Sequence, residues 1–213
     1  MKLYGYWRSS AAYRVRIAMH LKGLAFESIP VHLVKDGGEQ HKAAYTDLNP
    51  THLVPTLVDE DVTLHQSMAI IEYLDDKFPS VSVYPKDIVA KAKVKTLSLD
   101  IACEMHPVNN LRVQQYLVKS FSLQESDKLT WSHHWMNVGF VAVEKQLELN
   151  AGRYCFGDFI TMADICLVPQ VYNANRFNLD MSDFPNICRV VDNCNKHPAF
   201  IASLPENQED AQK

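Results

Sequence analysis

The sequence predicts two domains of unlike class, a small α/β domain followed by an all-helical domain. Strand-like runs and helices alternate early in the chain, in the order βαβ and then ββα. From Asp87 onward the strand signals vanish and only helical stretches remain. A segment with serines and a tyrosine between prolines, Pro79 to Pro85, separates the two parts. We therefore expect domains at residues 1–80 and 86–213, with a linker over 81–85.

The first half of the α/β domain is predicted as strand, helix and strand. An apolar stretch from Lys2 to Tyr6 is strand-like. The helix after it has apolar residues at helical spacing, namely Ala11, Val15, Ala18 and Met19. Lys22-Gly23 is a typical helix stop, and Phe26 to Leu33 is rich in β-forming residues.

The second half of this domain is predicted as a short helix, two strands and a longer helix. Asn49-Pro50 ends the short polar helix. Val54 to Val58 and Val62 to Leu64 are predicted as the two strands. The helix that begins at Ser67 carries one apolar face and stops at Pro79.

The second domain contains long helical patterns. One of them runs from about Asp127 to Leu149. Thr161-Met162-Ala163-Asp164 has the pattern of a capping box, with Thr at the N-cap and Asp at N3, and Ile160 and Ile165 stand in the positions of a hydrophobic staple. We assign this element a structural role and no catalytic part.

Composition excludes several classes of function. Hydrophobic residues make up 47% of the chain, enough for a buried core. The net charge is −4 and the basic residues form no runs, so nucleic-acid binding has no electrostatic footprint. Apolar stretches are shorter than the roughly 20 residues of a membrane span, and no apolar signal core follows Met1. We expect a cytoplasmic protein with no nucleic-acid or membrane partner.

The cysteines and histidines point to no metal site. The five cysteines form no C-x-x-C pair, which argues against structural zinc and dithiol redox chemistry. The nine histidines lack metal-ligand spacing, since His133 and His134 are adjacent and would face different sides of a helix.

The most informative functional feature is the start of the first helix, where Arg8, Ser9 and Ser10 follow a strand. Free N–H groups and the helix dipole favour an anion there, and a serine hydroxyl adds a hydrogen bond of roughly 1.5–3 kcal/mol to a charged group. A thiolate would suit such a site. No cysteine lies between Trp7 and Met19, so a sulfur anion would have to arrive on a small molecule, of which glutathione is the leading candidate. The alternative is that the two serines only cap the helix.

Short motifs along nearly the whole chain support the ligand-binding interpretation. They are Arg8-Ser9-Ser10, Tyr13-Arg14-Val15-Arg16-Ile17-Ala18, Lys35-Asp36-Gly37-Gly38, Leu48-Asn49-Pro50, Val54-Pro55-Thr56-Leu57, Gln66-Ser67 and Thr161-Met162-Ala163-Asp164. In this combination the chain resembles the zeta class of glutathione transferases. The resemblance implies a thioredoxin-like domain, a helical bundle, a homodimer that binds glutathione, and maleylacetoacetate isomerase activity.

The resemblance also assigns residues to glutathione. Ser9, supported by Ser10, would stabilise the thiolate. A cis bond between Val54 and Pro55 would place the Val54 backbone against the cysteinyl part, although an X–Pro bond is cis in only about 5–6% of cases. The other matching positions are Gln40, Gln66, Ser67, His106 and Asn110. At the start of the third helix, Ser67 is in addition expected to act as an N-cap serine while the helix end holds the γ-glutamyl carboxylate.

Substrate recognition is expected from arginines, because the natural substrate of the zeta class is a dicarboxylate. The resemblance assigns this part to Arg176 and, with less support, to Arg112 and Arg8; a lone arginine on a helix is otherwise usually a surface group. His106 would border the substrate. Arg8, His106 or a backbone amide would stabilise charge on the conjugated carbonyl during thiolate addition.

One position departs from the zeta signature Ser-Ser-Cys, because the third residue here is Ala11. A similar alanine-bearing form occurs in bacterial maleylpyruvate isomerases, so maleylpyruvate is an alternative substrate that the sequence does not separate from maleylacetoacetate. Two further alternatives stay open. They are a general glutathione-conjugating transferase and a non-catalytic binding protein of the same fold.

Overall fold

The computed structural model describes residues 1–211, which form two compact units. Unit 1 comprises Met1–Val83 together with the described chain from Lys196 onward, and unit 2 comprises Tyr84–Asn195. The division falls inside the predicted linker. The predicted helical domain spans residues 86–213, whereas the segment from Lys196 belongs to unit 1. The reason is tertiary, because helix α10 (Pro198–Ser203) packs against helix α1 (Ser10–Leu21).

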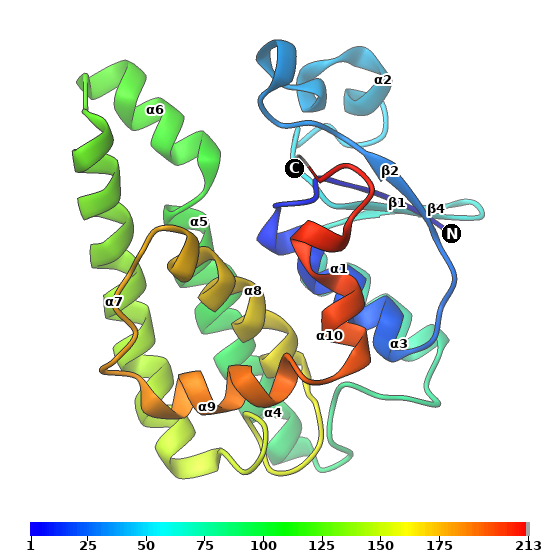
Figure 1. The fold of residues 1–213 in the computed structure, drawn as a ribbon. Helices are drawn as coiled ribbons and strands as arrows, with labels where there is room; N and C mark the ends of the chain where they lie inside the picture. Colours follow the sequence, from blue (N-terminus) through cyan, green and yellow to red (C-terminus); the bar gives the residue numbers. More distant parts are fainter. Residues whose placement is uncertain (212–213) are drawn as a thin grey trace. The chain divides into compact units, whose positions relative to one another are not determined.

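Unit 1 is built on a four-stranded sheet of order β2-β1-β3-β4 (Figure 1). The strands are β1 (Lys2–Gly5), β2 (Glu27–Pro30), β3 (Thr56–Asp59) and β4 (Val62–His65). β1 is parallel to β2 and antiparallel to β3, and β3 is antiparallel to β4. Helices α1 and α3 (Ser67–Lys77) lie on one side of the sheet and α2 (Ala43–Thr46) on the other (Figure 1). This arrangement confirms the predicted thioredoxin-like fold.

Helix α1 is the centre of the unit 1 core. The sequence predicts one apolar face, but nearly the whole helix is buried, including Val15, Ile17 and Met19 at 0% exposure. Its burial follows from its neighbours, because α3 and α10 both pack against it. Each large apolar side chain buried in this way stabilises the fold by roughly 1.5–3 kcal/mol.

Strand β2 is shorter than predicted, and short helical turns follow it. The predicted strand Phe26 to Leu33 is reduced to Glu27–Pro30. Pro30 stands at the end of this edge strand, where a residue without an N–H donor is tolerated. The chain then forms the single turns η1 (Lys35–Gly37) and η2 (Glu39–His41), which lead into α2.

The segment after α3 is tied to unit 1 by a buried ion pair. Lys22, which caps the C-terminus of α1, lies 2.7 Å from Asp75 Oδ1, and the two side chains are only 1% and 9% exposed. Lys22 Nζ also donates to the carbonyl oxygens of Phe78 and Val81. Burial alone would raise the pKa of Asp75, but hydrogen bonds from Lys22, the Val83 amide and Ser82 outweigh it and hold the pKa below its usual value.

We expect Lys22→Met to lower the free energy of unfolding by about 2 kcal/mol, measured by urea denaturation. Removing one partner of a buried ion pair costs about 3–5 kcal/mol, but Asp75 keeps two other donors and the loss is therefore smaller. Because the pKa of Asp75 is lower in the folded than in the unfolded protein, its ionisation stabilises the fold at a pH above the unfolded-state pKa. This stabilisation is lost as the pH falls through the folded-state pKa. The unfolding free energy of the variant should therefore depend less on acid pH. A stability equal to that of the wild type would contradict this assignment.

Unit 2 is helical, with an isolated bridge between Ala151 and Gly157 as its only β pairing. Its helices are α4 (Ile88–Leu99), η3 (Asp100–Met105), α5 (His106–Val108), α6 (Leu111–Phe121), α7 (Glu125–Asn150), α8 (Met162–Arg176) and α9 (Pro185–Cys194). Helix α7 confirms the long helix predicted from Asp127 to Leu149. Thr161 and Asp164 form the predicted capping box of α8.

The turn η3 has π-helical geometry, and Pro107 explains it. Proline has no N–H, so the carbonyl of Cys103 loses its usual α-helical donor and the helix widens in the preceding turn.

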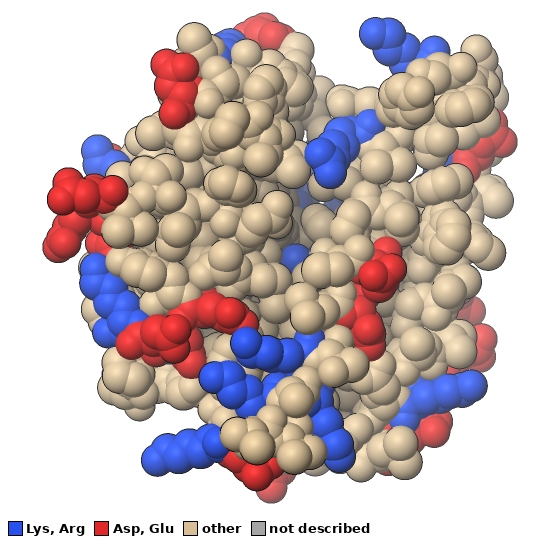
Figure 2. Space-filling model, turned by 180° about the vertical axis from the view of Figure 1, so that it is seen from behind, with Lys and Arg blue, Asp and Glu red and all other residues tan. Residues whose placement is uncertain are grey.

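The surface carries acidic and basic side chains interspersed over the face shown in Figure 2. Among residues 1–211, no helix combines the length and apolarity needed to cross a bilayer. Over the same residues, no group of three or more His, Cys, Asp or Glu side chains has the arrangement of a metal site.

Candidate active site

The predicted anion site is a tight turn that connects β1 to α1. Ser9 N donates to Tyr6 O at 2.9 Å and closes a four-residue turn. Ser9 is the N-cap of α1, with extended backbone dihedrals, and its Oγ accepts a hydrogen bond from Ala12 N at 3.2 Å. Ser10 is the first helical residue and is buried.

The cap and a ligand can share the Ser9 hydroxyl. A serine oxygen has two lone pairs and one O–H donor, and the cap uses only a lone pair. The O–H of Ser9, which is half-buried, is therefore available to a thiolate at the N-terminus of α1. Capping and thiolate stabilisation, which the sequence presented as alternatives, are compatible in this geometry.

Arg8 lies beside Ser9 and is held by aromatic rings. Its guanidinium carbon is 5.2 Å from the centre of the Trp7 ring and 5.9 Å from that of Tyr6. These cation–π contacts keep a half-exposed positive charge next to the helix N-terminus.

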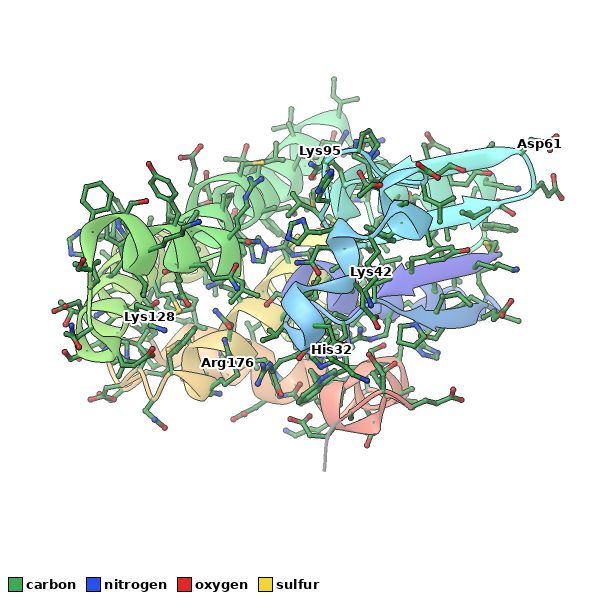
Figure 3. All side chains as sticks on the ribbon, turned by 90° about the horizontal axis from the view of Figure 1, so that it is seen from above. His32, Lys42, Asp61, Lys95, Lys128 and Arg176 are labelled. Atoms are coloured by element: carbon green, nitrogen blue, oxygen red, sulfur yellow. The ribbon has the colours of Figure 1, made fainter. Side chains whose placement is uncertain are left out.

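Gln40 lies in turn η2 and is 7% exposed. Its Nε2 donates to Leu33 O at 3.2 Å, whereas its buried Oε1 accepts no hydrogen bond from residues 1–211. The preceding loop is organised by His32, labelled in Figure 3, whose Nδ1 accepts from the amides of Val34 and Lys35. Glu39 closes the loop by accepting from His32 N.

The bond between Val54 and Pro55 is cis, as the resemblance implies. Two side chains hold the backbone directly before Val54, because Leu53 O accepts from the Tyr45 hydroxyl and from Asn49 Nδ2. Burial raises the pKa of Tyr45, so the phenol stays protonated and able to donate.

The start of α3 differs from the prediction at Ser67. The N-cap is Gln66, with φ of 72°, and Ser67 is the first helical residue. The Ser67 hydroxyl does not cap the helix; it accepts from Arg14 Nη1 at 3.3 Å. Ser67 and Arg14 are 4% and 2% exposed, so a buried guanidinium lies at the N-terminus of α3. Gln66 is exposed.

Arg14 and His32 are the functional candidates that the sequence analysis missed. Arg14 lies in the motif Tyr13-Arg14-Val15-Arg16-Ile17-Ala18, but helical periodicity alone places it on α1 with no sign that it reaches α3. His32 has no local signal either, since its role depends on the loop conformation.

In unit 2 the predicted residues lie at three helix ends, namely the starts of α5 and α6 and the end of α8. Asn110 is the N-cap of α6 and accepts from Arg112 N, so its side chain has a structural role of its own. His106 begins α5 and is half-buried, whereas Arg112 is exposed.

Arg176, labelled in Figure 3, is the last residue of α8 and is exposed. Its guanidinium carbon is 4.3 Å from the centre of the Phe177 ring, and its Nη2 donates to Asn173 Oδ1. Helix α7 anchors this end of α8, because His133 Nε2 lies 2.7 Å from Phe177 O. Phe177 and Asn173 thus constrain the orientation of the Arg176 side chain.

A thioredoxin-like unit with a serine at the N-cap of its first helix is followed in the chain by a helical unit, and comparison with known proteins identifies this two-domain class. Two family profiles match the chain, "Glutathione S-transferase, N-terminal domain" over residues 8–77 and "Glutathione S-transferase, C-terminal domain" over residues 136–198.

Relatives that match nearly the whole chain are described as isomerases of maleyl compounds. A "Probable maleylacetoacetate isomerase" of Vibrio cholerae is 49% identical and covers 98% of this chain and 97% of its own length. A solved structure described as the holo form of a maleylpyruvate isomerase of the zeta class is 41% identical, with a TM-score of 0.97 and full coverage of both chains. A maleylacetoacetate isomerase from Methylobacterium extorquens AM1, solved with bound malonate and GSH, is 34% identical with a TM-score of 0.96, also over both whole chains. The chain belongs to the glutathione S-transferase family, and its predicted resemblance to the zeta class is confirmed.

Proposed function

We propose that the protein catalyses the glutathione-dependent cis–trans isomerisation of a maleyl dicarboxylate, with maleylacetoacetate as the substrate and maleylpyruvate as the alternative. The observation that carries this proposal is the Ser9 hydroxyl, which caps α1 and keeps its O–H free for a thiolate. Relatives of both names at similar coverage support the reaction class and leave the choice of substrate to experiment.

The residues of unit 1 fit glutathione. The N-terminus of α3, with the buried Arg14 guanidinium on Ser67, suits the γ-glutamyl carboxylate. The buried Gln40 Oε1 has an open acceptor position for an amide N–H. We propose Ser9, Ser10, Gln40, Val54, Pro55, Gln66 and Ser67 of unit 1 and His106 and Asn110 of unit 2 as glutathione residues.

The chemistry requires the thiol to ionise near neutral pH. When bound, glutathione supplies a nucleophile whose reversible addition turns the substrate double bond into a rotatable single bond. A thiol of pKa about 8.5 is only a few per cent ionised at pH 7, and lowering that pKa by two takes roughly 2.7 kcal/mol. A hydrogen bond from Ser9 together with the α1 N-terminus is of this size.

Positive groups would hold the substrate and stabilise charge on its carbonyl oxygen. We propose Arg176 and Arg112 for the substrate carboxylates, with Arg8 and His106 as the groups near the reacting carbonyl.

Direct isomerase assays with maleylacetoacetate and maleylpyruvate test the proposal and rank the substrates by kcat/KM. Conjugation of an uncharged electrophile without isomerisation of either compound would instead establish a general transferase. We also propose that the protein forms a homodimer, which sedimentation analysis tests, and that it is cytoplasmic.

We expect Arg176→Ala to raise KM for the maleyl dicarboxylate about tenfold or more, while conjugation of an uncharged electrophile changes little. A guanidinium paired with a carboxylate contributes roughly 1.5–3 kcal/mol, and only when that carboxylate is present. Steady-state kinetics with both substrates on the same variant provide an internal control. Equal losses for the two substrates would show that Arg176 supports the fold of α8 and does not bind substrate.

A further inference from the structure

The Trp7 peptide groups in the active-site turn are held from outside the turn. Trp7 N donates to Asp210 Oδ2 at 3.0 Å, and Trp7 O accepts from Arg16 Nη2 at 2.9 Å. Asp210 is 203 residues away in sequence, in the segment that follows α10. The turn that presents Arg8 and Ser9 is therefore held by Asp210, from the segment after α10, and by Arg16 of α1.

The segment that carries Asp210 is itself well anchored. Gln208 Nε2 donates to Leu204 O and Ala202 O, and Asn207 Nδ2 donates to Ile201 O. Arg16 Nε donates to Ser203 O at 3.3 Å, so the same arginine joins the end of α10 to the turn. Figure 1 shows this segment, in red, beside the blue start of α1.

The position of Trp7 controls the reactive groups next to it. Its carbonyl belongs to the peptide plane shared with Arg8, and its ring carries the Arg8 guanidinium at 5.2 Å. The turn then closes through Ser9 N and Tyr6 O, and the Ser9 hydroxyl accepts from Ala12 N directly after it. A rotation of the Trp7 peptide would move both Arg8 and Ser9.

Asp210 provides a carboxylate acceptor for the Trp7 backbone N–H of the turn. A carboxylate that accepts a backbone N–H makes a charge-assisted hydrogen bond, which is stronger than a neutral one. Asp210 is half-buried, so solvent screens this contact only in part.

We propose that Asp210 is a positioning residue for the thiolate-stabilising turn, so that the segment after α10 tunes the activation of glutathione. This inference rests on the proposed function of Ser9. Asp210 is not assigned any contact with glutathione or substrate; it acts through the Trp7 amide and, with Arg16 on the opposite carbonyl, keeps the turn in one orientation.

The test compares Asp210→Ala, Asp210→Asn and the control Glu209→Gln. Asparagine keeps an oxygen acceptor for Trp7 N, alanine removes it, and Glu209 is an exposed carboxylate in the neighbouring position. We measure kcat and KM, the pKa of the enzyme-bound thiol from the ultraviolet absorbance of the thiolate, and the urea unfolding midpoint.

Asp210→Ala should lower kcat about tenfold and raise the pKa of the bound thiol by roughly 1, because small displacements of positioned groups are costly to catalysis. KM for the dicarboxylate and the unfolding midpoint should change little. Asp210→Asn should stay within about threefold of the wild-type kcat, since the neutral acceptor is retained, and Glu209→Gln should match the wild type.

Wild-type kcat and thiol pKa in Asp210→Ala would overturn the proposal. A lowered unfolding midpoint with an unchanged thiol pKa would also overturn it, since Asp210 would then be purely structural. The thiol pKa separates this inference from the proposed reaction. If the wild type isomerises neither maleyl compound but Asp210→Ala still raises the pKa of bound glutathione, the proposed reaction fails and the positioning role stands.

Discussion

Ser9→Ala is expected to lower the isomerase kcat/KM by about 10²-fold while glutathione still binds. The substitution removes a hydrogen bond to a charged group, worth roughly 1.5–3 kcal/mol, which corresponds to a factor of about 10 to 150. The loss should appear mainly in kcat, because thiolate stabilisation matters most in the chemical step. The pKa of the bound thiol should rise in parallel, as measured from thiolate absorbance against pH.

The cap on α1 has to be separated from the catalytic role of the same hydroxyl. Alanine at an N-cap costs about 1 kcal/mol of stability, whereas glycine costs only a few tenths. Ser9→Gly should therefore lose activity like Ser9→Ala but unfold nearly like the wild type. Ser10→Ala should cost less activity, because Ser10 lies inside the first turn of α1 and is buried. Near-wild-type activity in both Ser9 variants would remove Ser9 from the chemistry.

Local sequence patterns were sufficient to predict most of the fold. The capping box at Thr161 and Asp164, the stop at Lys22-Gly23 and the long helix α7 depend on residues close together in the chain. The thioredoxin-like fold and the cis bond at Pro55 came from the family resemblance, because neither follows from local propensity.

Long-range contacts account for what the sequence did not reveal. Ser67 looks like an N-cap from its place before an apolar run, yet its hydroxyl accepts from Arg14, 53 residues earlier. The segment after Lys196 follows the helices of unit 2 and was assigned to the helical domain, but it packs on α1 and holds Trp7 through Asp210. No periodicity or spacing encodes such contacts.

Asp164 is a buried carboxylate of unit 2 on which we expect the stability of the fold to depend strongly. The carboxylate is 0% exposed and accepts from Cys155 N at 2.8 Å and from Thr161 N and Thr161 Oγ1 at 2.8 and 2.9 Å. Burial raises the pKa of Asp164, although these hydrogen bonds work in the opposite direction. The side chain therefore joins the loop at Cys155 to the start of α8, whose side chains are largely buried.

We expect Asp164→Ala to lower the free energy of unfolding by about 4 kcal/mol, a large share of the 5–15 kcal/mol of a typical domain. Alanine leaves two backbone N–H groups buried without an acceptor, at roughly 1–3 kcal/mol each, and removes the N3 side chain of the capping box. Asp164→Asn should lose about half as much, because one amide oxygen replaces two carboxylate oxygens. Asp158→Ala is the matched control, since that exposed carboxylate also accepts a backbone N–H, from Arg153, and solvent can replace it. Urea denaturation followed by circular dichroism measures all three, and equal losses for Asp164→Ala and Asp158→Ala would show that burial of the cap contributes nothing to the stability of unit 2.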